Sequence, residues 1–121
     1  MDAEELKKRT KEFALRVIKL VGALPKSVEG RAVANQLVRS GTSVAANYRA
    51  ACRARSRTEF IAKLGVVLEE ANESLLWLEL VVAAKLLPAA QVDALLKEAS
   101  EIVAIMAASR KSAITRSKSE I

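Results

Sequence analysis

Four arginines gather in the run YRAACRARSRTEF, which begins at Tyr48. They are Arg49, Arg53, Arg55 and Arg57. A guanidinium group presents a planar fork of donors that binds a phosphate in bidentate fashion and stacks on bases. The run therefore predicts a surface that attracts polyanions. The same side chains can instead be solvated, or paired with Glu59, Glu69 or Glu70, and the sequence leaves both interpretations open.

Two earlier arginines extend this basic surface. Arg31 and Arg39 fall at helical spacing with Arg49 and Arg53, on a stripe that contains no acidic residue. Residues 26–57 carry seven basic side chains and one acidic one, whereas residues 58–87 carry two basic and five acidic ones. The net charge of +6 therefore arises in one segment, which suits a polyanion as partner. A basic segment followed by an acidic one also suits pairing between the two, and both interpretations stay open. The predicted nucleic-acid-binding residues are Arg31, Arg39, Arg49, Arg53, Arg55 and Arg57.

The acidic segment carries Glu69, Glu70 and Glu73 on one predicted helix, and Trp77 follows. A hard metal ion would need further carboxylates from a facing helix, and the inward-facing positions offer none. We therefore predict no metal site and expect a solvated or interface face. Trp77 is either part of the core or an apolar anchor between subunits. The predicted oligomer interface consists of Glu69, Glu70, Glu73 and Trp77.

Several kinds of catalytic chemistry lack the residues that they need. The chain has no histidine, which excludes histidine-activated nucleophiles and the Glu-x-x-His pairs of di-iron bundles. Cys52, the single cysteine, falls on an apolar stripe, so we expect it to be packed rather than reactive. The four glycines are scattered and form no phosphate-binding loop. We predict that the protein is not an enzyme and binds no cofactor.

Four helices must position these side chains. Asp2 and Ser27 are predicted N-caps, Pro25 ends the first helix, Ser56 opens a capping box with Glu59, and Pro88 precedes the fourth helix. Short connections favour an all-α, antiparallel, up-down-up-down four-helix bundle. We predict one bundle domain, residues 1–114, followed by a basic flexible tail, residues 115–121.

Apolar residues recur at steps of three and four along each predicted helix. In the second helix the inward stripe contains Leu37, Gly41, Val44 and Tyr48. The small residues from Ser40 to Ala46 predict that a neighbouring helix comes close there. The charged N-terminus argues against a signal peptide, and no apolar run approaches the roughly 18 residues of a membrane span. We expect a cytoplasmic protein with no membrane contact.

Several sequence motifs between Leu24 and Leu80 carry a family resemblance. They are Leu24-Pro25, Gln36-Leu37-x-Arg39-Ser40-x-Thr42-Ser43, Ala46-Asn47, Ser56-x-x-Glu59-Phe60 and Glu73-Ser74-x-x-Trp77-Leu78-Glu79. Taken together, they resemble the bacterial four helix bundle protein family. Its members include proteins encoded within intervening sequences of 23S ribosomal RNA genes. The resemblance spans roughly residues 10–110.

The resemblance implies a four-helix bundle that assembles as a homopentameric ring. It also implies kinship with the accessory proteins of diversity-generating retroelements, which are basic barrels that bind nucleic acid and a reverse transcriptase. Many family members have Glu and Gly where this chain has Ala50 and Ala51. We therefore expect no role that depends on that glutamate.

The charge map is compatible with a ring on independent grounds. A basic second helix and an acidic third helix can pair head to tail between copies, and such a contact closes when the rotation allows. Our leading hypothesis is a non-enzymatic, ring-forming homo-oligomer that binds the RNA or DNA backbone. The alternative is a protein-interaction scaffold or accessory subunit, for example of a reverse transcriptase, with no role in nucleic-acid binding.

Overall fold

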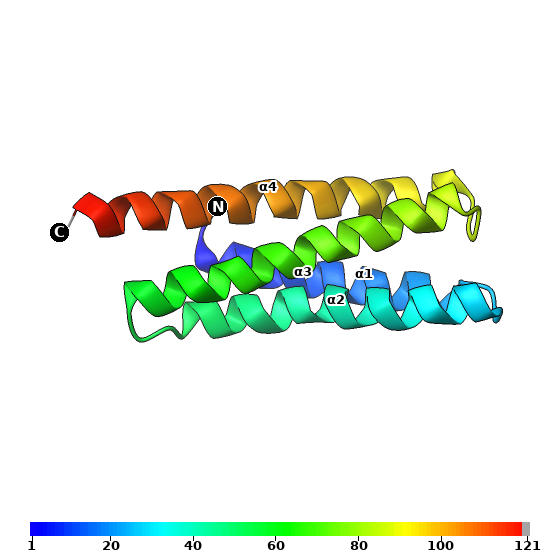
Figure 1. Ribbon diagram of the computed structural model, residues 1–121, viewed down its shortest axis with the longest axis horizontal. Helices are drawn as coiled ribbons and strands as arrows, with labels where there is room; N and C mark the ends of the chain where they lie inside the picture. The colour runs from blue at the N-terminus through cyan, green and yellow to red at the C-terminus, as the bar shows by residue number, and fades with distance from the viewer. Residues whose placement is uncertain (120–121) are drawn as a thin grey trace.

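The computed structural model describes residues 1–119, whose secondary structure consists of four α-helices. They are α1 (Ala3–Gly22), α2 (Val28–Cys52), α3 (Arg57–Ala83) and α4 (Ala89–Ser119). Figure 1 shows the helices side by side, each running opposite to the one before it. The predicted all-α four-helix bundle is confirmed. Within the predicted tail, residues 115–119 continue α4, and residues 120–121 lie outside the described part.

The first three helices begin where the sequence predicted. Asp2, Ser27 and Ser56 have extended backbones, and each side-chain oxygen accepts a hydrogen bond from the backbone N–H three residues later. These bonds satisfy amides that have no partner within the helix. Along the described residues, none of the four helices is long and apolar enough to cross a membrane.

The core is built from the apolar stripes that the sequence predicted. In α2, Leu37, Gly41, Val44 and Tyr48 are all buried. Phe60 of α3 is only half-buried against the same core. The largest fully buried apolar side chains are Phe13, Val17, Leu37, Val44, Leu64, Val67, Leu78, Val81, Val92, Ile102 and Met106. One continuous core thus fixes how the outward faces of the helices are turned.

Small residues of α2 bring its neighbours close, as predicted. A Cβ atom at Gly41 would lie only 2.8 Å from Cγ1 of Val17 in α1, and Val17 is fully buried. On the other flank, the buried Ser74 of α3 donates a hydrogen bond from Oγ to Ser40 Oγ at 2.9 Å. Both contacts depend on the small size of the α2 residue.

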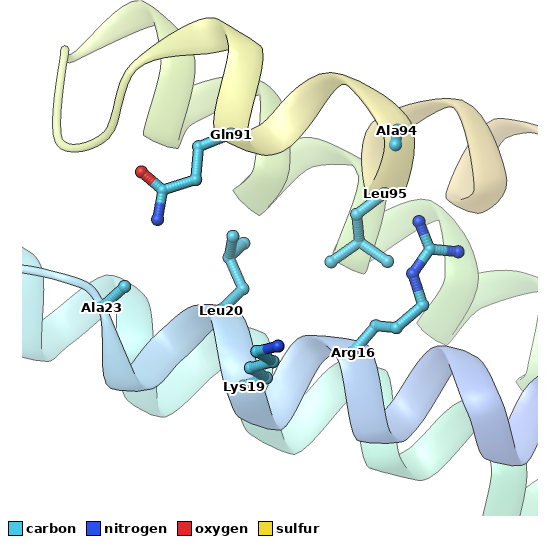
Figure 2. A pocket seen from close by; sticks show the side chains of 7 residues that line it. All are labelled: Arg16, Lys19, Leu20, Ala23, Gln91, Ala94 and Leu95. Carbon is cyan, nitrogen blue, oxygen red and sulfur yellow. The ribbon is translucent and has the colours of Figure 1, made fainter.

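The contact between α1 and α4 is the least extensive in the bundle. Arg9 of α1 donates to Glu98 of α4 at 2.8 Å from Nε and at 2.7 Å from Nη2. These bonds raise the pKa of the Arg9 guanidinium. Toward the other end, the two helices leave a groove of about 340 Å³. Figure 2 shows Leu20 reaching into it from α1 and Leu95 from α4.

Candidate nucleic-acid interface

The arginine stripe of α2 faces outward. Arg31, Arg39, Arg49 and Arg53 are all exposed, on the side of the helix opposite the buried stripe. The helical periodicity that turns the apolar residues inward therefore displays these cations along the whole length of α2. The surroundings of the individual arginines nevertheless differ.

A basic hollow lies at the turn between α2 and α3. It is a groove of about 460 Å³, lined by Ala50, Arg53, Arg55, Glu59 and Lys63. Arg53 is the C-cap of α2, and Arg55 lies in the turn itself. Three cations face one carboxylate there, so the groove has a net positive charge. A groove of this charge attracts phosphate groups.

Glu59 is the one carboxylate in this turn groove, and it has a structural role. Its backbone N–H donates to Ser56 Oγ at 3.1 Å, and its Oε2 accepts the backbone N–H of Arg55 at 2.8 Å. The carboxylate therefore occupies the amide end of α3, a position that would otherwise suit a bound anion. The cationic side chains, rather than these amides, are what the groove offers to a ligand.

Arg57 differs from the other arginines of the turn. It is half-buried, whereas Arg49, Arg53 and Arg55 are exposed. Lys63 lines the turn groove, although it is not among the binding residues predicted from the sequence. It follows Glu59 by four positions, which places both on one face of a helix. That spacing could have identified Lys63 from the sequence.

Arg39 is engaged within its own chain. Its Nη1 donates to Glu70 of α3 at 3.0 Å, and its Nη2 pairs with Glu73. The hydrogen bond with Glu73 raises the pKa of the Arg39 guanidinium, with Glu70 adding to the effect. Trp77 donates from Nε1 to the same Glu73 carboxylate at 3.2 Å. The structure therefore gathers Arg39 and three predicted interface residues into one α2–α3 cluster.

The predicted interface residues accordingly have different surroundings. Glu70 and Glu73 pair with Arg39, and Trp77 is half-buried against the core. Glu69 is exposed on the outward face of α3. Among residues 1–119, no group of three cysteine, aspartate or glutamate side chains is arranged to hold a metal ion.

The second hollow, between α1 and α4, has a different lining. Arg16, Gln91, Leu20 and Leu95 face it, together with Lys19 and two alanines (Figure 2). Its lining combines two cations, an amide and apolar groups, without a carboxylate.

Comparison with known proteins identifies the family of this chain. Residues 4–108 match the family model described as 23S rRNA-intervening sequence protein. The chain belongs to this family. The match spans parts of all four helices, including the turn groove and the Arg39 cluster. The family resemblance identified from the motifs is therefore confirmed.

A solved structure of similar fold supports the assignment. It is a protein of unknown function from the S23 ribosomal protein family of Bacteroides thetaiotaomicron. The two chains are 34% identical, the match covers 92% of this chain and 99% of that one, and the TM-score is 0.84. No curated protein matches the chain. Neither the family nor this solved relative is described as an enzyme.

Proposed function

We propose that this protein is a non-enzymatic, ring-forming homo-oligomer that binds the backbone of RNA or DNA. The observation that carries the proposal is the turn groove, where Arg53, Arg55 and Lys63 surround a single carboxylate. Such a site takes up phosphates without reading base sequence. A ring would repeat the groove in every subunit, so that weak single sites act together on one long polyanion. We place this activity in the cytoplasm.

Removing two groove cations tests nucleic-acid binding. We expect Arg53→Ala with Arg55→Ala to weaken binding to a structured RNA by about tenfold at ~100 mM salt, since two phosphate contacts are lost. Fluorescence anisotropy across a salt series measures both the affinity and its salt dependence. The matched control is Lys19→Ala with Lys26→Ala, which removes the same charge at the opposite end of the bundle. If both double variants bind like the parent, the proposal is wrong.

Glu59 provides a test of opposite sign. Glu59→Gln removes the groove's one negative charge but keeps an oxygen that can accept the Arg55 N–H. We expect affinity for RNA to rise about two- to fivefold, the size of an exposed charge interaction. Circular dichroism checks that the start of α3 remains helical. Unchanged or weaker binding by the folded variant would show that phosphates do not enter this groove.

Exposed apolar side chains support the oligomer. The outward face of α3 carries Leu76 and Leu80, which are 49% and 38% exposed, beside Glu69. The outward face of α1 carries Leu15 and Ile18, which are 56% and 49% exposed, and basic Lys11 lies one turn before Leu15. We propose that the α3 face of one copy packs against the α1 face of the next. The faces belong to different helices, so the contact is heterologous and a ring can close.

Sedimentation tests this arrangement. We expect the parent protein to sediment as a ring, with five copies as the family resemblance implies, and the folded variant Leu76→Glu with Leu80→Glu to sediment as a monomer. Leu15→Glu should have the same effect from the other side of the contact. A monomeric parent would refute the oligomer while leaving nucleic-acid binding to be judged by the anisotropy measurements.

The alternative function is a protein-interaction scaffold or accessory subunit. The same exposed leucines favour it, because an apolar face suits a protein partner as well as a second copy. A reverse transcriptase is the partner that the family resemblance suggests. This alternative predicts negligible RNA and DNA affinity and a stable complex between the two purified proteins. Anisotropy and co-elution measurements therefore separate the two functions.

A further inference from the structure

All four aromatic side chains of the chain turn toward its core. Phe13 and Tyr48 are 1% and 4% exposed, and Phe60 and Trp77 are half-buried against the core. Proteins that bind single-stranded nucleic acid typically stack its bases on exposed aromatic rings. This surface instead offers cations, which suit the phosphates of the backbone. Its chemistry therefore favours a ligand whose bases are already stacked on each other.

A second cluster of cations lies on α4, on the side facing α3. Arg110, Lys111 and Lys118 line a groove of about 310 Å³, together with Leu68 of α3. The sequence from 102 to 119 contains no acidic residue. We call these three cations the α4 cluster. Its charge is therefore not balanced by carboxylates of the same helical segment.

The α4 cluster lies beside the same part of α3 as the turn groove. Arg110 donates from Nε to the backbone oxygen of Ile61, in the second turn of α3, at 3.2 Å. Lys63 of the turn groove is only two residues further along α3. Figure 1 shows α4 continuing past the start of α3 and the α2–α3 turn at this end of the bundle. Segments about 50 residues apart in sequence thus meet at one end of the molecule.

The start of α3 separates the two sets of cations. Its outward positions Thr58, Ala62 and Val66 are exposed and uncharged. An α-helix with its side chains is about 10–12 Å wide, so the cations form two rows roughly that far apart. A double helix carries two rows of phosphates across each groove, and the major groove of B-DNA is about 12 Å wide. A-form RNA presents a wide, shallow minor groove between its strands.

We infer that the nucleic acid bound under the proposed function is double-helical, with its two strands held by the turn groove and the α4 cluster across the start of α3. This inference rests on the proposed function and adds the form of the ligand and a second set of contacts. Lys111 and Lys118 hold one strand, and Arg53, Arg55 and Lys63 hold the other. The uncharged start of α3 faces the groove between the strands.

Duplex and single-strand binding by matched variants tests the inference. The ligands are a 20-base-pair RNA duplex, the DNA duplex of the same sequence, and an unstructured single strand of each. We expect the parent to bind a duplex at least tenfold tighter than the corresponding single strand. Lys111→Ala with Lys118→Ala should weaken duplex binding about tenfold and lower the salt slope by about two, as expected for two lost phosphate contacts. Single-strand binding should change less than twofold.

The control variant is Lys85→Ala with Lys97→Ala, which removes equal charge from the far half of the bundle and should bind every ligand like the parent. Equal affinity for single strands and duplexes, or a Lys111/Lys118 variant that binds duplexes normally, would overturn the inference. In either case, binding that still depends on Arg53 and Arg55 would leave the proposed function standing. The RNA and DNA duplexes report which kind of double helix is bound.

Discussion

The two flanks of α2 and the contact between α1 and α4 represent opposite ways of packing helices. Gly41 of α2 lets α1 come so close that a methyl group at this position would clash with Val17. Ser40 of α2 lets α3 come so close that its hydroxyl bonds directly to that of Ser74. Between α1 and α4, an ion pair from Arg9 and an open groove take the place of close packing. The same fold thus contains one contact that depends on shape and one that depends on charge, and they should respond differently to mutation.

The largest effect is expected at Gly41. Gly41→Val places three carbon atoms against the fully buried Val17, so the free energy of unfolding should fall by about 3 kcal/mol. Urea denaturation followed by circular dichroism measures this change. The control is Gly22→Ala, because nothing lies within 4 Å of a Cβ atom there, and it should raise stability by about 0.5 kcal/mol. A well-tolerated valine at position 41 would show that α1 and α2 can move apart at little cost.

Arg9 should matter less than Gly41. Its side chain and that of Glu98 are only 21% and 17% exposed, so Arg9→Met leaves a half-buried carboxylate without its two hydrogen bonds. We expect the free energy of unfolding to fall by about 1–2 kcal/mol. Lys7→Met is the control, because the Lys7–Glu4 pair lies at the surface and should contribute nothing measurable. Equal losses from both variants would contradict the special role of Arg9.

Added volume should have opposite effects in the open groove and in the buried core. Ala94 lines the open groove between α1 and α4, so Ala94→Leu can pack on Leu20 and Leu95 and should raise stability by about 0.5–1 kcal/mol. Ala71 of α3 is 1% exposed, and Ala71→Leu should cost about 2 kcal/mol through overpacking. Thermal denaturation of both variants measures the contrast. A destabilised Ala94→Leu variant would show that the groove has no room for the larger side chain and must stay open for the bundle to be stable.

Most of the fold follows from local sequence signals. The caps at Asp2, Ser27 and Ser56 and the close approach at Gly41 each depend on side chains within one turn or one stripe. The loose contact between α1 and α4 does not, since it depends on the angle at which two distant helices cross. The helical periodicity of Leu20 and Leu95 turns both inward but does not determine how closely they meet.

The candidate site was predictable only in part. Periodicity correctly placed Arg31, Arg49 and Arg53 at the surface, because the opposite face of α2 is apolar. It could not show that Arg39 pairs with Glu70 and Glu73, which depends on how α2 and α3 are rotated against each other. Composition places Lys118 in a basic tail, and only the fold brings the cations of α4 beside the α2–α3 turn. The charge of a segment can be predicted from its sequence, whereas which charged side chains pair with each other depends on the tertiary structure.

The smallest effect is expected at the start of α1. It shows whether α1, which contacts α4 only sparsely, can open at this end while the rest of the bundle stays folded. The backbone N–H of Glu5 donates to the Asp2 carboxylate at 2.8 Å and lowers the pKa of Asp2 below its ordinary value. The cap therefore contributes fully to stability above the unfolded-state pKa of about 3.9, and its contribution is lost as pH falls through the lower folded-state value.

In that pH range we expect the Glu5 amide to lose hydrogen-exchange protection, while the amide of Val44, in the closely packed α2, keeps its protection. Asp2→Asn retains a cap that does not titrate, so its Glu5 protection should not depend on pH in this range. If Val44 and Glu5 lose protection together in the parent, α1 does not open independently and the contrast between the two regions fails.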